Sequence, residues 1–423
     1  MTNKISHGGF TGLGIAPRLL DVIDSLKFKV PTPIQSKSIP VGIEGKDLIA
    51  IAQTGTGKTL AFGIPMIQRL AQIKGGGLIL LPTRELALQV DKALGPFNRA
   101  FAIRTAVIIG GESISHQRRA LEKGPRIIIA TPGRLLDLLE QGLVTMAEVQ
   151  ILVFDEADRM LDMGFAPQIN RIMSVMPKKR QTLLFSATIP SEIVAIAQRH
   201  MELPIRVEIA PSGTAAEKVI QELFFIAREA KTRLLEVMLQ QYPGPALVFT
   251  RTKHGARKLS RQVRGMGHAS AEIHSDRSLP QRKEALEGFK TGKYRVLVAT
   301  DIAARGIDVT GIEIVINYDL PSNSEDYVHR IGRTGRAGRA GRAVSFASLD
   351  QRSDVRKIEQ VMRTALPVKP VPSLPPERPR PAHEHGYAPA ALPRQPQAEQ
   401  NRPAFGRAPK DRKSNRFRTS KRR

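Results

Sequence analysis

A glycine-rich segment is the first part of the 423-residue chain whose residue types could do chemistry. Its sequence is AQTGTGKT, residues Ala52–Thr59, and it follows the apolar run Leu48–Ile51 and precedes a helical pattern. A strand, a glycine-rich loop and a helix together form a phosphate-binding loop, because the loop amides and the helix N-terminus face the phosphates. The general pattern has glycine where this chain has Ala52. The alternative is a glycine-rich turn that only caps a helix.

The roles of the loop residues follow from this pattern. Lys58 is expected to reach the β- and γ-phosphates of a nucleotide, and the Thr59 hydroxyl is expected to bind Mg²⁺. The predicted nucleotide-binding residues of the loop are Thr54, Gly55, Thr56, Gly57, Lys58 and Thr59.

A second polar segment follows an apolar strand pattern. Ile151–Phe154 stops abruptly at Asp155, Glu156, Ala157 and Asp158. Open α/β sheets bind ligands at the carboxyl ends of their strands, so these carboxylates are candidates for a site. Asp155 fits the Mg²⁺-holding carboxylate of phosphate-loop enzymes, and Glu156 is placed to orient or deprotonate an attacking water. An acidic helix N-terminus stabilised by the helix dipole is the alternative.

The third segment is a run of arginines at every third position: Arg330, Arg333, Arg336, Arg339 and Arg342. The whole chain carries a formal net charge of +26, which indicates a polyanionic partner, with nucleic acid as the default. A basic solvated surface or a ribosomal-type protein would give the same charge. Trp is absent and aromatic residues are only 5%, so wide stacking platforms for single strands are not expected.

Two α/β domains are expected to position these segments. Short apolar runs alternate with helical patterns, which is typical of parallel sheets covered on both faces. The predicted strands are Leu48–Ile51, Leu78–Leu81, Thr105–Ile109, Ile127–Ala130, Ile151–Phe154, Thr182–Phe185, Ile205–Val207, Ile220–Phe225, Ala246–Phe249, Ala271–Ile273, Val296–Ala299, Ile314–Asn317 and Ala343–Phe346. The predicted division is a first domain over residues 1–209, a linker over 210–218, a second domain over 219–365 and a tail over 366–423.

The tail differs from the domains in composition. From Pro367 to Arg423 the chain has 12 Pro, and 14 Lys and Arg against 4 Asp and Glu. Such a segment buries too little apolar surface to fold, so the tail is predicted to be disordered.

Composition also limits the other classes. No apolar run reaches the ~18 residues that a membrane span needs, and the N-terminus lacks the apolar centre of a signal peptide. We therefore expect a cytoplasmic protein with no membrane partner. The absence of Cys excludes disulfides and thiolate metal sites, and the nine His residues form no cluster with ligand spacing.

Taken in order, the motifs resemble those of the DEAD-box ATP-dependent RNA helicases, with the bacterial RhlE-like branch as the expected subgroup. The resemblance covers Phe10 to Phe346. It rests on FKVPTPIQ at 28–35, the phosphate loop, PTRELA at 82–87, GG at 110–111, TPGR at 131–134, DEAD at 155–158, SAT at 186–188, ATDIAARGID at 299–308 and HRIGRTGR at 329–336. It implies two RecA-like domains.

The resemblance also implies roles for single residues. Gln35 would pair with the adenine edge, Phe28 would stack on its face, and Asp308 would bind the ribose. Arg333 and Arg336 would be arginine fingers, which supply positive charge where negative charge develops, an effect of about 10³–10⁵ in rate in other nucleotide hydrolases. Asp158, Ser186 and Thr188 would couple hydrolysis to strand separation. The implied RNA contacts are Pro82, Thr83, Arg84, Gly111, Thr131, Arg134, Arg251, Arg282, Thr300 and Gly306.

Some positions stay open at this stage. Leu279 stands where the family has a glutamine, three residues before Arg282. Arg330 has no clear role, and Arg339 and Arg342 are interpreted as solvated or RNA-facing charge.

The function that the resemblance implies is RNA-stimulated ATP hydrolysis, with Mg²⁺, that unwinds short RNA duplexes or remodels RNA–protein complexes by domain closure. RNA is the expected partner, with weak sequence preference, and ribosomal particles or RNA-decay proteins are the candidate assemblies. A DNA helicase and an RNA clamp without turnover are the rival functions. The clamp would be expected to have lost Lys58, Glu156 or Arg333, and all three are present.

Overall fold

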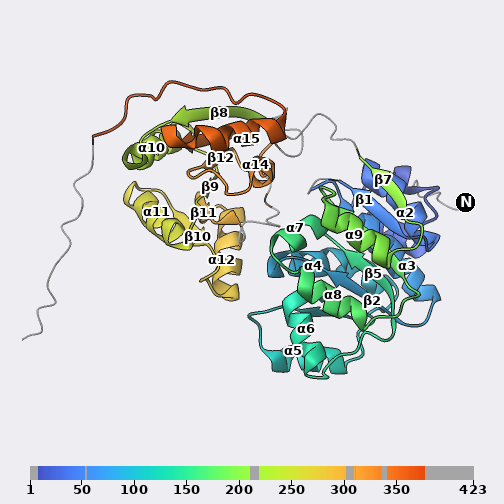
Figure 1. The fold of residues 1–423 in the computed structure, drawn as a ribbon. Helices are drawn as coiled ribbons and strands as arrows, with labels where there is room; N and C mark the ends of the chain where they lie inside the picture. The colour runs from blue at the N-terminus through green and yellow to red at the C-terminus, as the bar shows by residue number, and fades with distance from the viewer. Residues whose placement is uncertain are drawn as a thin grey trace, which may run out of the picture. The chain divides into compact units, whose positions relative to one another are not determined.

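The computed structural model describes residues 8–52, 55–209, 219–301, 309, 311–335 and 341–376. Two parallel β-sheets, each with its own helices, make up this part of the chain (Figure 1). The predicted linker over 210–218 lies outside the described residues, as does everything after Pro376.

The first sheet has seven strands. They are β1 (Leu48–Ile51), β2 (Gly76–Leu80), β3 (Thr105–Ile108), β4 (Ile127–Ala130), β5 (Val149–Phe154), β6 (Gln181–Ser186) and β7 (Ile205–Glu208). All pairings are parallel, in the order β3-β4-β2-β5-β6-β1-β7. Strands β1, β2 and β4 are apolar throughout, as expected for a parallel sheet that helices cover on both faces.

The elements that connect and cover this sheet begin with a 3₁₀ turn. They are η1 (Gly8–Phe10), α1 (Pro17–Ser25), α2 (Pro33–Ile43), α3 (Lys58–Gln72), α4 (Arg84–Ala100), α5 (Ile114–Glu122), α6 (Pro132–Glu140), α7 (Ala157–Asp162), α8 (Ala166–Ser174) and α9 (Ser191–His200).

The second sheet has six parallel strands in the order β10-β11-β9-β12-β13-β8. They are β8 (Val219–Phe225), β9 (Ala246–Phe249), β10 (Ser270–Ile273), β11 (Val296–Ala299), β12 (Ile314–Asn317) and β13 (Gly341–Ala347). Its helical elements are η2 (Arg228–Ala230), α10 (Lys231–Gln241), α11 (Lys253–Gly265), α12 (Leu279–Lys290), α14 (Ser324–Ile331), η3 (Leu349–Gln351) and α15 (Arg352–Met362).

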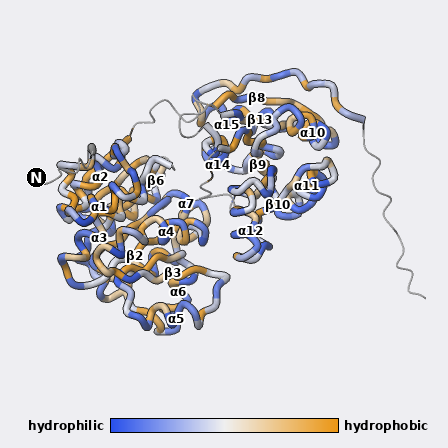
Figure 2. Tube along the Cα trace, turned by 180° about the vertical axis from the view of Figure 1, so that it is seen from behind, coloured by the Kyte–Doolittle hydropathy of each residue, from blue (hydrophilic) through white to orange (hydrophobic). Residues whose placement is uncertain are grey.

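The predicted strands and the α/β fold class are confirmed. Every predicted strand is present, with ends that differ by at most two residues. β2, β5 and β13 each begin two residues before the predicted start. In β5 the added Val149 is buried and pairs with Gly76. Figure 2 shows the strands of the first sheet as mainly hydrophobic and helix α11 as mainly hydrophilic.

The start of the predicted tail differs from the expectation. The backbone N–H of Leu223 in β8 donates to Pro367, and the N–H of Lys369 donates back to Leu223. Leu374 packs against the core that contains Phe346. Residues 367–376 therefore extend the second domain, because main-chain pairing with an edge strand needs no apolar run in the added segment.

The helices of the described ranges are all too short or too polar to cross a membrane.

Candidate active site and nucleic-acid interface

The sheet order brings three of the predicted motif loops together. Strands β5, β6 and β1 are neighbours, and they lead respectively into the acidic segment, the SAT segment and the phosphate loop. Because the strands are parallel, their carboxyl ends lie at one edge of the sheet, where open α/β sheets bind ligands.

Lys58 is placed to receive a phosphate. It is the first residue of α3, and its side chain is buried, with Nζ 3.8 Å from Asp155 Oδ1. Nζ has no hydrogen-bond partner among the described residues. A buried ammonium group with unused donors is costly. Phosphate oxygens at the helix N-terminus would supply the missing acceptors.

The glutamine segment is joined directly to the phosphate loop. Gln35 is buried; its Oε1 accepts from the Thr32 backbone N–H at 2.9 Å, and its Nε2 donates to the Gly57 carbonyl at 3.1 Å. Gln35 therefore couples the start of α2 to the loop, a contact that the sequence pattern did not indicate. Phe28 lies between α1 and α2 and is 43% exposed, which leaves its ring free to stack.

Asp155 and Glu156 have pKa values shifted in opposite directions. Burial raises the pKa of Asp155 to about 6, although the Lys58 charge opposes the shift. Burial alone would raise the pKa of Glu156, but the charges of Arg159 and Lys58 outweigh it and lower this pKa. An ionised Glu156 next to a phosphate site can act on a water molecule.

The backbone of Glu156 is strained. Its φ of 54° lies in the left-handed region, at the residue that caps the start of α7. Such a conformation is costly for a residue with a Cβ and is often found at functional sites. Arg159 Nη1 donates to Glu156 Oε2 at 2.7 Å, while Oε1 has no partner in the described ranges.

The donor set fits a magnesium ion. Mg²⁺ prefers oxygen ligands and is usually held by one or two protein groups plus phosphates and water. The Asp155 carboxylate and the Thr59 hydroxyl supply oxygen at the carboxyl edge of the sheet, next to the unsatisfied Lys58 ammonium. These residues are therefore compatible with a nucleotide-bound Mg²⁺.

Asp158 connects the acidic segment to the SAT segment. Its Oδ2 accepts from Ala187 N at 3.0 Å, from Thr188 N at 2.9 Å and from Thr188 Oγ1 at 3.0 Å. The Asp158 backbone N–H donates to Ser186 Oγ at 3.2 Å. The predicted coupling residues Asp158, Ser186 and Thr188 are thus in direct contact.

The other half of the first sheet carries the predicted RNA-binding loops. Strands β3, β4 and β2 are neighbours, and each leads into one loop: Gly110–Gly111 after β3, Thr131–Arg134 after β4 and Pro82–Arg84 after β2. The nucleotide and RNA candidates of this domain therefore occupy two adjacent stretches of the same sheet edge.

Arg84 lies across the glycine pair. A Cβ added to Gly111 would meet Arg84 Nη1 at 2.1 Å, and one added to Gly110 would meet Nη2 at 2.9 Å. Gly111 also has a φ of 76°. The glycine pair therefore creates the space in which the Arg84 guanidinium group lies.

The remaining candidates of these loops are partly used for structure. Thr83 Oγ1 caps α4 by accepting from Leu86 N at 3.3 Å, and Thr83 is buried. Pro82 and Thr131 are also buried. Arg134 Nη1 donates to the Glu112 carbonyl at 3.0 Å.

The second domain carries three further RNA candidates. Arg251 follows β9, and its Nη2 donates to the Leu320 carbonyl at 3.3 Å. Thr300 follows β11 and lies half-buried, with its N–H donating to Ile273. Arg282 lies in α12, and burial lowers its pKa.

The arginines of the run differ in their contacts, and their regular spacing did not indicate these differences. Arg330 is buried; it donates to Asp301 through Nε and Nη2 and to Asn317 Oδ1, and its guanidinium stacks on the Phe249 ring at 4.9 Å. It is therefore a structural link between three strand ends. Arg333 is buried, and its Nε donates to the His329 carbonyl at 3.3 Å.

The interpretation of Arg342 as solvated or RNA-facing charge is wrong. Arg342 lies in β13, donates to Glu222 of the neighbouring β8 at 2.7 Å and stacks on Tyr242 at 5.0 Å. Cross-strand pairing decided its environment, and this pairing is not visible in the local sequence.

Some predicted site residues lie outside the described ranges. They are Thr54, Gly306, Asp308, Arg336 and Arg339. Sequence reasoning also missed Arg159, the ion-pair partner of Glu156; its position three residues later on α7 was the available signal.

Comparisons with known proteins agree with this arrangement. The family description DEAD/DEAH box helicase matches residues 32–196, and Helicase conserved C-terminal domain matches residues 229–338. The chain is 37% identical to the ATP-dependent rRNA helicase RRP3 of Debaryomyces hansenii, over 88% of this chain and 79% of that protein. It is 42% identical to the ATP-dependent RNA helicase CshA of Listeria monocytogenes, over 84% and 69%.

Solved structures give the same result. S. cerevisiae Dbp5 bound to RNA and ADP BeF3 matches with a TM-score of 0.74 and 31% identity, covering 85% of this chain and 95% of that chain. Mss116p bound to ssRNA and AMP-PNP matches with a TM-score of 0.78 and 28% identity, covering 85% and 78%.

Proposed function

This chain belongs to the DEAD/DEAH box helicase family, and we propose that the residues at the carboxyl edges of its two sheets carry out the family's reaction. The protein is an RNA-dependent ATPase that unwinds short RNA duplexes or remodels RNA–protein complexes. The buried Lys58 ammonium, which has no hydrogen-bond partner among the described residues, is the observation that carries the proposal for ATP.

The hydrolytic step uses the residues around the phosphate loop. Lys58 binds the β- and γ-phosphates, and Glu156 orients or deprotonates the attacking water. Asp155 and Thr59 would hold Mg²⁺, which when bound neutralises charge on the phosphates. Arg333 and Arg336 act as the arginine fingers. Gln35 and Phe28 receive the adenine, the latter through its exposed ring, and Asp308 binds the ribose.

Asp158 transmits the state of the nucleotide to the SAT segment. Its three accepted hydrogen bonds hold Ala187 and Thr188, so a displacement of the acidic segment moves the end of β6 with it. Ser186 adds a bond to the Asp158 backbone.

RNA is gripped through its backbone. Arg84, Gly111 and Arg134 line adjacent loops in the first domain, with Pro82, Thr83 and Thr131 shaping them, and Arg251, Arg282, Thr300 and Gly306 are the contacts of the second domain. Phosphate contacts give affinity without reading sequence, so binding has weak sequence preference and strong salt dependence. ATP and RNA together favour closure of the two domains.

The finer assignments rest on the sequence. The RhlE-like branch is supported by the compact core and basic tail, and a tree of family sequences would test it. We propose a cytoplasmic location, as the sequence analysis expects, and cell fractionation would test it. Ribosomal RNA is a candidate substrate, because several similar proteins carry the name rRNA helicase.

The deciding experiment is steady-state ATP hydrolysis with no nucleic acid, with single-stranded RNA and with DNA of the same sequence. The expected result is stimulation by RNA only, and loss of turnover in Glu156→Gln with ATP binding retained. Equal stimulation by DNA would support a DNA helicase. Binding of RNA without turnover would support a clamp.

A further inference from the structure

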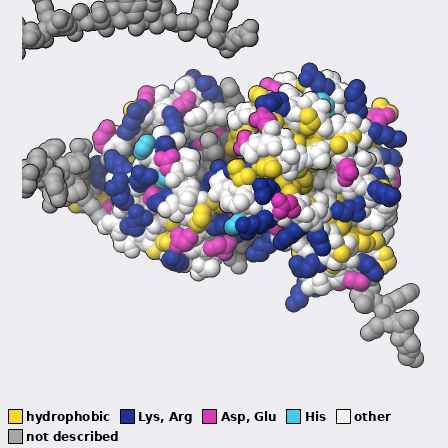
Figure 3. All heavy atoms as spheres, turned by 90° about the horizontal axis from the view of Figure 1, so that it is seen from below, with side chains coloured by type: hydrophobic (Ala, Val, Ile, Leu, Met, Phe, Trp, Pro, Cys, Tyr) yellow, Lys and Arg dark blue, Asp and Glu magenta, His cyan; other side chains and the backbone are white. Residues whose placement is uncertain are grey.

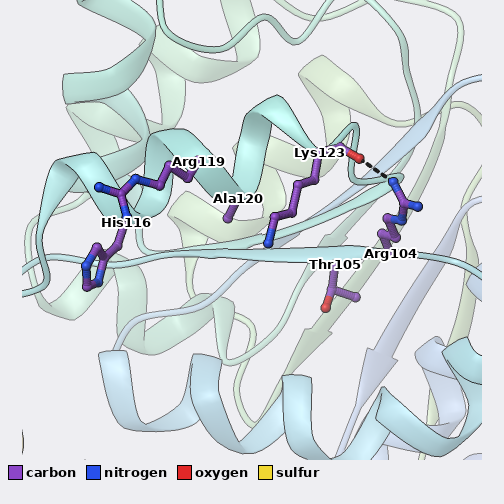
Figure 4. A pocket seen from close by; sticks show the side chains of 6 residues that line it. All are labelled: Arg104, Thr105, His116, Arg119, Ala120 and Lys123. Atoms are coloured by element: carbon purple, nitrogen blue, oxygen red, sulfur yellow. Dashed lines mark hydrogen bonds between the residues drawn. The ribbon is translucent and has the colours of Figure 1, made fainter.

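A basic depression lies on the first domain, between α5 and the edge strand β3, and none of its lining residues was assigned a role above. Its volume is about 440 Å³. The lining residues are Arg104, Thr105, His116, Arg119, Ala120 and Lys123. Figure 4 shows the side chains of the helix residues projecting from one side of α5, and Figure 3 shows Lys and Arg side chains spread over the face of the molecule that is seen from below.

The spacing of the helix residues explains why they share one face. His116, Arg119, Ala120 and Lys123 stand at i, i+3, i+4 and i+7, which places them in one row along a helix. His116, Arg119 and Lys123 are exposed. Within the described ranges neither Arg119 nor Lys123 forms an ion pair.

The adjacent arginine is different. Arg118 Nε donates to Glu122 Oε1 at 3.1 Å, so its charge is already matched by a carboxylate on the same helix. The cationic residues of the depression therefore differ from Arg118, because their charges are not matched by a carboxylate on the same helix.

Arg104, which directly precedes β3, adds a third cationic side chain to Arg119 and Lys123. Arg104 Nη1 donates to the Lys123 carbonyl at the end of α5 at 2.9 Å, as the dashed line in Figure 4 marks. This bond uses one of the five donors of the guanidinium group. Asp91 is a nearby carboxylate; it accepts from Thr105 Oγ1 at 2.6 Å. Arg104, Arg119 and Lys123 thus line a depression whose lining residues include no carboxylate.

The depression continues from a loop already assigned to RNA. Strand β3 leads into Gly110–Gly111, and α5 begins three residues later at Ile114. Helix α5 then runs back along β3, since Lys123 at its end contacts Arg104 just before the strand. From His116 to Lys123 the row covers about 10 Å, at about 1.5 Å per residue.

We propose that this depression binds the phosphodiester backbone of RNA that continues beyond the strand held by the loops of the first domain. The proposal rests on the function proposed above, because it uses the Gly110–Gly111 loop as the point from which the RNA enters. Unpaired cations that converge in a depression suit successive phosphates, and they add affinity without sequence preference. An isolated anion would not require a row that starts beside the RNA loop.

The test measures RNA binding by the full chain with a non-hydrolysable ATP analogue present. The probes are a strand of about eight nucleotides and the same strand lengthened by about twelve nucleotides at its 5′ or its 3′ end. The double variant Arg119→Ala/Lys123→Ala is expected to bind one of the lengthened strands about tenfold more weakly, with an unchanged affinity for the short strand. The slope of log K against log salt for that strand should become shallower by about 1.5, as two lost phosphate contacts require.

The matched control is Arg118→Glu, compared with Arg119→Glu. Both variants change the charge of α5 equally, but only the second changes the depression, so only the second should weaken the binding of the lengthened strand. Equal weakening by both would mean a general charge effect and would overturn the proposal. Unchanged binding of both lengthened strands by the double variant would overturn it as well. The same holds if the double substitution weakens the binding of an acidic peptide but not that of RNA.

The short strand separates this proposal from the proposed function. If the native protein does not bind the short strand, the RNA-gripping loops are wrongly assigned. If it binds the short strand and the double variant keeps full affinity for the lengthened strands, only the depression is wrongly assigned. Thermal unfolding of each variant shows that the first domain is intact.

Discussion

At the scale of single residues, Asp158 shows how one carboxylate can join two loops. Replacing it with alanine removes the acceptor of three hydrogen bonds from Ala187 and Thr188. Because both donor residues are only half-buried, water can accept some of the hydrogen bonds that Asp158 accepted. We expect Asp158→Ala to lower the free energy of unfolding by about 2 kcal/mol, measured by urea denaturation.

The control for this change is Asp137→Asn, on the exposed side of α6, where the carboxylate is 60% exposed and lies 3.7 Å from Arg134. A surface change of this kind is expected to stay within about 0.5 kcal/mol. If Asp158→Ala were as mild as Asp137→Asn, the hydrogen bonds to the SAT segment would contribute little to the stability of the first domain.

Gly111 allows a separate test of the RNA-binding loops. A Cβ there would displace the Arg84 guanidinium group, and the φ of 76° adds backbone strain. Gly111→Ala should therefore weaken RNA binding by about tenfold, the size of one or two lost charged contacts, while ATP binding stays unchanged. Fluorescence anisotropy with a short RNA and equilibrium binding of a labelled nucleotide measure the two effects.

Gly142→Ala provides the matched control. Gly142 also has a positive φ, of 66°, but a Cβ there meets no atom within 4 Å. Gly142→Ala therefore carries the backbone strain, about 1–2 kcal/mol, without displacing an arginine. Equal weakening of RNA binding by the two variants would show that strain, and not the position of Arg84, is responsible.

At the scale of elements, the end of β10 makes the second domain sensitive to acid. His274 is fully buried, and its ring nitrogens have no hydrogen-bond partner among the described residues. Burial lowers its pKa, although Glu272, 3.6 Å from Nε2, opposes the shift. Arg277 and Arg257, which pair with Glu272, disfavour the charged ring as well.

The direction of the pH dependence follows from this shift. Below the ordinary histidine pKa of about 6.5, the unfolded chain binds a proton that the folded chain does not bind. Stability should therefore be highest above about pH 7 and should fall as the pH is lowered through 6.5. Urea denaturation of the native chain and of His274→Gln at pH 7.5 and pH 5.5 measures this change in the free energy of unfolding. If the free energy of unfolding of the variant fell equally steeply between the two pH values, the assignment to His274 would be contradicted.

The strands were predictable, but their order was not. Each strand is a short apolar run between polar helices, so β1, β4 and β9 have the predicted ends. The order β3-β4-β2-β5-β6-β1-β7 depends on pairings between distant segments, and local patterns contain no information about them. The contact of Asp158 with Thr188 follows from the β5-β6 pairing, so only the family resemblance could indicate it in advance.

At the scale of the whole molecule, the net charge of +26 is used in several ways. Arg330 and Arg342 belong to the same evenly spaced basic run, yet each donates to a carboxylate and stacks on an aromatic ring. Arg119 and Lys123 remain without ion pairs in the described part of the chain. Arginine spacing alone could not distinguish these cases, because the partners come from other strands.

The C-terminal segment offers the last test of how that charge is used. Residues 377–423 contain 13 of the Lys and Arg residues and 4 acidic residues, and we expect them to attract RNA without sequence preference. Their deletion should raise the RNA concentration for half-maximal ATPase activity, with little change in the maximal rate or in stability. An unchanged RNA concentration would reject this role.

Deleting 367–423 should in addition destabilise the second domain, because Pro367 and Lys369 pair with Leu223. Thermal unfolding of the two truncated proteins therefore separates the structural part of the segment from its charge.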